Sequence, residues 1–291
     1  MSALTRRGFL GTAAIAAAAF DAFAHGRAGQ NPGGQGRGGQ ASAAPVPVPP
    51  GVTIEKDVVY GKGGATDLRL DIYHPRPGSE KRAVTLHAHG GGFTGGSKAT
   101  LAERILPFAA HGYVAIASQY RLIGQAPWPA MLEDVKAAIR WVRANATMLN
   151  VDPARIILVG YSAGGYLALT AAGTQNKTEM EGSGGNAGAG TQVEACVAFY
   201  PVLGGPPPSV SPATYVGAGY PPTVIFHGVA DTTVPVESSQ RLFQRMRDSK
   251  VPSELHTFDG AEHVFDRDPS LAAACGSLAD LFITRQRAKK T

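Results

Sequence analysis

Residues 155–164, which read RIILVGYSAG, decide the fold of this chain. They predict a short apolar strand that runs into a G-x-S-x-G turn, and the small residues at 166–172 permit a helix after it. Because the chain must reverse sharply at Ser162, Gly160 and Gly164 carry only hydrogen where side chains would collide. The pattern predicts a serine whose Oγ is held above a sheet edge as a nucleophile. Such a motif arises by chance in a chain with 37 glycines, so the strand-turn-helix setting is the stronger evidence.

Strand-like and helix-like stretches alternate along the rest of the chain. Strands are expected at 52–60, 68–73, 84–88, 113–119, 156–161, 195–202, 223–227 and 254–258, and further helices at 98–111, 129–148, 237–250 and 269–287. Most of these strands are near-continuous apolar runs, which is typical of strands covered on both faces. The pattern predicts an α/β fold with an eight-stranded, mostly parallel, doubly wound sheet flanked by helices. Residues 61–64 are expected to form a turn, and the polar, Gly-rich residues 174–191 a surface loop.

The first 50 residues are predicted to lie outside the folded domain. Residues 1–24 resemble an export signal of the twin-arginine type, with Arg6 and Arg7, an apolar stretch and an A-x-A cleavage site. The general secretory route is the alternative export route, and either route predicts a periplasmic or secreted protein. The remaining alternative is an intracellular protein whose alanine-rich start arose by chance. Residues 25–50 are rich in Gly and Pro and predict a disordered tether. Residues 51–291 then form the catalytic domain.

The charged residues and cysteines exclude several functions. The formal charge is +5, but four basic residues crowd the last seven positions, which predicts a solvated tail rather than a nucleic-acid surface. Cys196 and Cys275 are expected to be two buried thiols rather than a disulfide, and their spacing matches no metal site. The short apolar stretch near the N-terminus is far below the ~20 residues that a membrane-spanning helix needs.

Two further residues complete the chemistry that Ser162 requires. A serine hydroxyl needs an imidazole to take its proton, and the imidazole needs a carboxylate to fix its tautomer. In this type of sheet the acid and then the histidine follow the serine, each on a loop after a strand. Asp231 follows the strand at 223–227 and His263 follows the strand at 254–258. The sequence therefore predicts a catalytic triad, with a structural turn as the alternative for Asp231.

Other acidic and histidine residues are weaker candidates. We expect solvent exposure or a structural role for these competitors: Asp259, Glu262 and Asp266 facing solvent on the histidine loop, Asp134 on a helix surface, Asp152 in a turn, and His256 packed within the last strand.

Residues 89–93, which read HGGGF, are expected to stabilise an oxyanion. Because glycines carry no side chain, their amides can approach a developing negative charge closely. Gly91, Gly92 and Ala163 are the predicted donors. A flexible loop and a phosphate cradle are the alternatives, but no Lys-Ser/Thr pair follows the glycines to hold a phosphate. His87 and His89 suggest a metal site, but no third ligand is visible, so neither a metal nor a cofactor is expected.

These motifs, taken together over residues 58–265, resemble the α/β-hydrolase superfamily. The chain is most similar to small bacterial carboxylesterases of the feruloyl and acetyl-xylan esterase-like branch, near the hormone-sensitive-lipase-like group. The resemblance also includes SQYRL at 118–122, WPA at 128–130, EDV at 133–135, DPARI at 152–156, SPATY at 211–215, PP at 221–222 and VP at 234–235. It departs at Tyr161, where that group usually has aspartate, and at the N-terminus, where the tether replaces a helical cap.

The resemblance implies cofactor-free hydrolysis of carboxylic esters through an acyl-enzyme. Too few residues lie between 202 and 221 for a large lid, so we expect an open site that admits small-molecule or carbohydrate esters. Phe93, Tyr161 and Tyr215 are candidates for lining this site, with core packing as the alternative for each. An amidase or formamidase, a peptidase of the prolyl-oligopeptidase type and a non-catalytic binding protein are the rival functions.

Overall fold

The computed structural model describes residues 47–175, 177–207 and 210–289. The predicted export signal, and the part of the tether before residue 47, lie outside the described residues. Within the described part of the chain, no helix is both long and apolar enough to cross a membrane.

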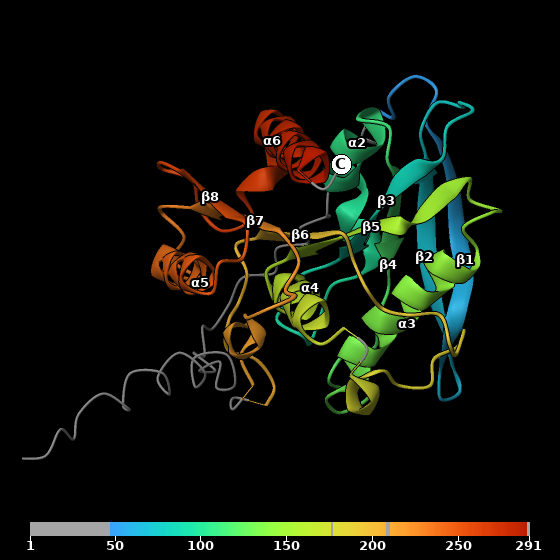
Figure 1. Cartoon of the computed structure of the whole chain (residues 1–291), viewed down its shortest axis with the longest axis horizontal. Coiled ribbons are helices and arrows are strands. Elements are labelled where there is room, and N and C mark those ends of the chain that lie inside the picture. Colours follow the sequence, from blue (N-terminus) through green and yellow to red (C-terminus); the bar gives the residue numbers. More distant parts are fainter. Residues whose placement is uncertain (1–46, 176, 208–209, 290–291) are drawn as a thin grey trace, which may run out of the picture. The chain divides into compact units, whose positions relative to one another are not determined.

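Eight strands form one sheet (Figure 1). They are β1 (Thr53–Gly63), β2 (Thr66–His74), β3 (Arg82–Ala88), β4 (Val114–Ser118), β5 (Val151–Tyr161), β6 (Ala195–Phe199), β7 (Thr223–Gly228) and β8 (Ser253–Phe258). The strand order is β1-β2-β4-β3-β5-β6-β7-β8. β2 is antiparallel to both of its neighbours, and all other pairs are parallel. The predicted eight-stranded, mostly parallel sheet is thus confirmed.

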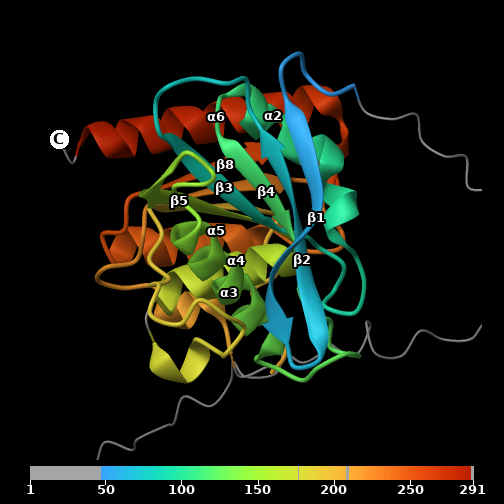
Figure 2. The ribbon, with the colours of Figure 1, turned by 90° about the vertical axis from the view of Figure 1, so that its right-hand side faces the viewer.

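Helices cover both faces of the sheet (Figures 1 and 2). They are α2 (Ala102–Ala110), α3 (Ala130–Ala144), α4 (Ala163–Gly173), α5 (Val236–Asp248) and α6 (Pro269–Ala288), with short 3₁₀ turns η1 (Lys98–Leu101), η2 (Thr178–Met180), η3 (Pro212–Tyr215) and η4 (Phe265–Arg267). α2 and α6 lie on one face, and α3, α4 and α5 on the other. Each face has its own apolar core, and neighbouring residues of β5 alternate between them: Leu158 belongs to one and Val159 to the other. Burial on both faces explains why the strands are continuously apolar.

The two helices on the α6 face approach each other closely. A Cβ added to Gly276 of α6 would lie 2.8 Å from the Cβ of Pro107 in α2. A residue with a side chain at this position would push the helices apart, so the glycine permits the close packing. Cys275, beside it, is a buried free thiol, as is Cys196, and the expectation of two unpaired thiols is confirmed.

Several local predictions were wrong in extent. β1 continues to Gly63, which pairs with Thr66, so the hairpin turn is shorter than residues 61–64 suggested. The strand expected at 195–202 ends at Phe199, because Tyr200 adopts a positive φ of 37° and Pro201 cannot donate to the sheet. The C-terminal basic residues are not simply a solvated tail. Arg285 and Arg287 belong to α6 and pair with carboxylates of β8 and of the segment before β6.

The loop at 174–191 is anchored to α3, which the sequence did not predict. Glu181 accepts from Lys136 Nζ and from Arg140 Nη1, each at 3.0 Å, and both cations are almost fully buried. Lys136 also donates to the carbonyl of Thr174. These contacts, called here the Glu181 cluster, hold a Gly-rich segment on the surface of the domain.

Asp134 does not lie on the helix surface as expected. Its side chain is 1% exposed and accepts two hydrogen bonds from the guanidinium of Arg121, at 2.7 and 2.8 Å. The partner comes from the loop after β4, so the local helical pattern around Asp134 gave no sign of it.

Candidate active site

Ser162 occupies a sharp turn between β5 and α4. Its backbone has φ 53° and ψ −114°, a region that L-residues adopt rarely. A Cβ added to Gly160 would lie 2.1 Å from the carbonyl oxygen of Gly164, and a Cβ on Gly164 would lie 2.1 Å from that of Ala88. The two glycines are therefore required by close backbone contacts, which is the steric reason inferred from the sequence.

The structure brings the three predicted side chains together at one edge of the sheet. His263 Nε2 lies 3.1 Å from Ser162 Oγ, and His263 Nδ1 lies 2.6 Å from Asp231 Oδ2. The residues follow β5, β7 and β8, whose carboxyl ends meet at the same edge because these strands are parallel. The side chain of Asp231 is fully buried and that of His263 is 15% exposed. The imidazole can therefore contact both the buried carboxylate and an incoming molecule.

Asp231 is oriented by further hydrogen bonds. Its Oδ1 accepts from the amides of Thr233 and Val234, at 2.9 and 2.8 Å. His227 Nε2 lies 2.9 Å from the Val234 carbonyl, so this nitrogen is the donor, and Nδ1 accepts from Ser239 Oγ. Burial lowers the pKa of His227, which keeps the ring neutral at neutral pH. His227 also approaches Asp231 Oδ2 at 3.3 Å. Sequence reasoning gave His227 no role, although it begins the segment that leads to Asp231.

The predicted oxyanion loop lies against Ser162. A Cβ added to Gly90 would lie 3.2 Å from Ser162 Cβ. Gly91 and Gly92 have φ values of 123° and 60°, and their amides donate no hydrogen bond within the described part of the chain. The amide of Ala163 opens α4, so it has no acceptor within the helix. Three amides are thus available beside Ser162.

His87 and His89 have structural surroundings. His87 Nδ1 lies 3.1 Å from Tyr161 Oη, and its ring packs against Phe108. His89 stacks on Tyr120, with ring centroids 4.2 Å apart. Burial lowers the pKa of His87 to about 3 and that of His89 to about 4, so both rings are neutral. In the described residues there is no group of three or more side chains that could hold a metal ion.

Of the three candidate substrate-binding aromatics, Tyr161 was wrong. Tyr161 is fully buried and stacks on Phe199 in the core on the α6 face. Tyr215 packs against Gly173 at the carboxyl end of α4, whereas Ser162 precedes the amino end of that helix. Phe93 follows the oxyanion loop, but it is only 6% exposed and packs edge-on against Tyr166.

Asp266 is the largest correction at the site. It was expected to face solvent, but it is 1% exposed and forms an ion pair with Arg104 of α2 at 3.2 Å. Tyr200 Oη donates to its other oxygen at 2.5 Å. No local pattern marks this contact, because the three residues come from different elements.

The other competitors have the roles expected of them. Asp259 and Glu262 are exposed. Asp152 accepts from the amide of Ala154 in a local turn. His256 stacks on Phe226 with centroids 5.3 Å apart.

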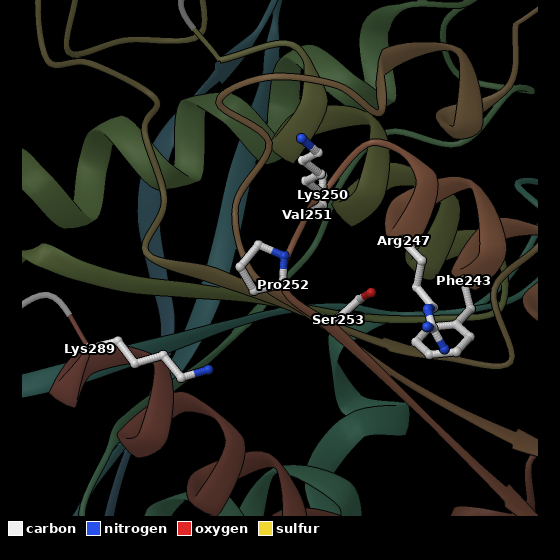
Figure 3. Close-up of a pocket in the computed structure, with 7 residues that line it drawn as sticks. All are labelled: Phe243, Arg247, Lys250, Val251, Pro252, Ser253 and Lys289. Atoms are coloured by element: carbon white, nitrogen blue, oxygen red, sulfur yellow. The ribbon is translucent and has the colours of Figure 1, made fainter.

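A hollow elsewhere on the surface is unrelated to this site. It has a volume of about 450 Å³. Figure 3 shows the residues that line it: Phe243 and Arg247 of α5, the residues 250–253 that lead into β8, and Lys289. It lies at the amino end of β8, whereas His263 follows the carboxyl end of that strand. The hollow and the serine therefore belong to opposite edges of the sheet.

Comparisons with known proteins agree with this geometry. A family model described as BD-FAE matches residues 70–204, and a prolyl oligopeptidase family model matches residues 208–277. "Probable carboxylic ester hydrolase LipM" of Mycobacterium tuberculosis is 30% identical over 257 residues, which is 77% of this chain. The alignment spans 59% of the length of LipM.

Two solved structures are similar over most of the domain. The thermophilic esterase Est2 of Thermogutta terrifontis, with propionate bound, has 34% identity and a TM-score of 0.71, covering 81% of this chain and 94% of Est2. A truncated carbohydrate esterase from gut microbiota has 25% identity and a TM-score of 0.67, covering 77% and 96%. With this sheet order, this serine turn and these relatives, the chain belongs to the α/β-hydrolase esterases.

Proposed function

We propose that this protein hydrolyses carboxylic esters through an acyl-enzyme formed on Ser162. The main support is the hydrogen-bonded row from Ser162 Oγ through His263 to Asp231, with distances of 3.1 and 2.6 Å. Such a row is the arrangement that turns a serine hydroxyl into a nucleophile at neutral pH.

The first half of the reaction forms the acyl-enzyme. His263 Nε2 takes the proton of Ser162 as Oγ attacks the ester carbonyl carbon. The carbonyl oxygen becomes an oxyanion, which the amides of Gly91, Gly92 and Ala163 stabilise. One donor of this kind contributes roughly 2.7–4 kcal/mol to transition-state stabilisation. The bond to the alcohol oxygen then breaks, and that oxygen takes the proton from His263.

The second half releases the acid. A water molecule gives a proton to His263 Nε2 and attacks the acyl carbon. The second oxyanion collapses, Ser162 Oγ leaves with the proton from His263, and the carboxylic acid departs. Asp231 stays ionised throughout and stabilises the imidazolium in both halves.

For the substrate we propose short-chain acyl esters, with acetyl and hydroxycinnamoyl esters of carbohydrates as the natural class. Est2 is described with propionate bound, and another structural relative is a carbohydrate esterase. Residues 200–222 join β6 to β7, and among those that the structure describes η3 is the one helical element, so no helical lid is described there. The sequence of residues 1–24 supports a further proposal, that the enzyme acts after export to the periplasm or the medium.

A substrate panel on matched variants tests this function. We expect wild type to hydrolyse p-nitrophenyl acetate and butyrate faster than longer chains, and to release acid from acetylated xylan or methyl ferulate. Ser162→Ala should lower kcat on the order of 10⁵–10⁶-fold, whereas Ser277→Ala, at an exposed position on α6, should leave it unchanged. Absence of both ester turnover and fluorophosphonate labelling in wild type would disprove the proposal.

The prolyl oligopeptidase match covers the segment with Asp231 and His263, so the panel also includes peptide anilides and N-formyl amides. Faster turnover of these amides than of any ester would assign the protein to the amidases or peptidases instead.

A further inference from the structure

A second buried carboxylate, that of Asp266, lies on the loop that carries His263. Asp266 belongs to η4, three residues after the histidine, and is almost completely enclosed. Its ion pair with Arg104 joins the histidine loop to α2. None of the proton transfers described above uses this carboxylate, yet a buried charge is costly unless it is paired.

Tyr200 connects this carboxylate to the histidine. Its phenol donates to Asp266 Oδ1 at 2.5 Å, and its ring lies against the His263 ring with centroids 4.6 Å apart and planes at 63°. Its backbone amide donates to the Phe226 carbonyl at 2.7 Å, which ties the residue to β7. The ring position of Tyr200 is therefore fixed from two sides, and so is the surface on which the imidazole rests.

The backbone around this contact is held in unfavourable conformations. Val264, directly after His263, has φ 63° and ψ 32°, a left-handed conformation that is rare for a β-branched residue. Tyr200 has φ 37°. Such conformations persist only where the surroundings enforce them. The contacts of Asp266 join these two segments, so they can hold Val264 and Tyr200 in these conformations.

Charged and titratable groups face this carboxylate from every packed element. Arg104 comes from α2, Tyr161 from β5, Tyr200 from the end of β6 and Cys275 from α6, while His263 lies on the loop of Asp266 itself. Burial raises the pKa of Asp266, and Arg104 and the Tyr200 phenol act against this rise. Burial also raises the pKa of Tyr200 well above its usual value, so the phenol keeps its proton and remains a donor.

We propose that Asp266 is a positioning residue of the active site. Through Tyr200 it holds the His263 ring in line with Ser162, and its charge, balanced by Arg104, favours the imidazolium that forms when His263 takes the serine proton. Asp266 touches neither substrate nor reacting atoms. This role rests on the proposed ester hydrolysis, but the coupling between Asp266 and His263 is measurable without it.

The test compares Asp266→Asn with Glu262→Gln. Both variants remove one carboxylate from the histidine loop, but Glu262 is exposed. For Asp266→Asn we expect kcat to fall about tenfold with KM within about twofold of wild type. Loss of the negative charge should also move the acid limb of kcat/KM to lower pH by about half a unit or more. Glu262→Gln should change none of these.

NMR titration of the His263 imidazole gives a readout that does not depend on turnover. Its midpoint should move to lower pH in Asp266→Asn and stay in place in Glu262→Gln. If wild type neither hydrolyses esters nor reacts with a fluorophosphonate, the proposed function fails, and this titration still tests the coupling.

A second variant keeps the test decisive if Asp266→Asn does not fold. Tyr200→Phe retains the ring against His263 and the Asp266–Arg104 pair but removes the phenol bond. It should lower kcat about threefold. Because the phenol acts against the rise in the pKa of Asp266, its loss leaves this carboxylate less ionised, and the imidazole midpoint should therefore also move to lower pH. A folded variant with wild-type kcat and midpoint would overturn the proposal. So would a fall in kcat without a change of midpoint, because that result indicates general loosening of the fold.

Discussion

Two carboxylates hold loops onto helices on opposite faces of the sheet. Glu181 joins the loop at 174–191 to α3 through Lys136 and Arg140, and Asp266 joins the histidine loop to α2 through Arg104. The two clusters have similar chemistry, namely a carboxylate with one or more buried cations. They differ in the next contact. Asp266 reaches the His263 ring through Tyr200, whereas the contacts given for the Glu181 cluster join its loop to α3. Burial of a charged pair therefore does not by itself indicate a role in the site.

The largest expected effect is a loss of stability without a loss of activity, in the Glu181→Gln variant. Glu181→Gln would leave Lys136 and Arg140 buried without their ion-pair partner, and breaking a buried ion pair typically costs about 3–5 kcal/mol. We expect the free energy of unfolding in urea to fall by that order, with cleavage of the loop at 174–191 by protease becoming faster. The kcat of the folded enzyme should stay within about twofold of wild type. A tenfold loss of kcat, like that expected for Asp266→Asn, would remove the distinction between the two clusters.

Lowering the pH should first destabilise the edge of the sheet that holds the site. His87, His89 and His227 lie at this edge and have lowered pKa values because they are buried, whereas the Glu181 cluster contains no histidine. The pKa of each of these histidines is lower in the folded protein than in the unfolded chain, where it is about 6.5. Above about pH 6.5 the histidine is neutral in both states and costs no stability. As the pH falls below about 6.5, the unfolded chain takes up a proton that the folded protein does not, and the free energy of unfolding decreases. The loss continues to about 4 for His89 and about 3 for His87.

Urea unfolding between pH 7 and 4.5 measures this effect. Each neutral histidine should contribute up to about 1.4 kcal/mol per pH unit to the slope. His87→Phe should reduce the slope by up to that amount, whereas His74→Gln, at a half-exposed position, should leave it unchanged. Equal slopes in all three proteins would contradict the neutral state of His87.

The smallest effect concerns a position far from both clusters. Lys250 follows the carboxyl end of α5 with φ 57°, and the amides of Lys250 and Val251 bond back to the carbonyls of Arg247 and Met246. This is the Schellman arrangement, in which glycine is favoured at the left-handed position. Lys250→Gly should raise the free energy of unfolding by about 0.5–1 kcal/mol without altering kcat. A lower midpoint in urea would show that the lysine side chain stabilises the helix end more than its conformation costs.

The sequence predicted what depends on local pattern. The turn at Ser162 and its glycines follow from sterics within ten residues, and strand order then places Asp231 and His263 at the same edge. These features could be predicted without knowing how the side chains pack.

The errors share a different cause. Asp134, Glu181 and Asp266 are polar and were expected at the surface, but each has a cationic partner from a distant element. The free energy of burying a charge depends on that partner, which no local periodicity reveals. Tyr161 was misplaced because the serine motif gives no information on which face of the sheet its second residue occupies.

The contact of Gly276 with Pro107 has a consequence for the newly made chain. It seats α6 on α2, the helix that presents Arg104 to the histidine loop. Ser162 leaves the ribosome 101 residues ahead of His263, and α6 comes later still. On the proposed mechanism, a polypeptide made only as far as Ser162 has a nucleophile without a base, and chemical competence requires that His263 and the helices that position its loop have also been synthesised.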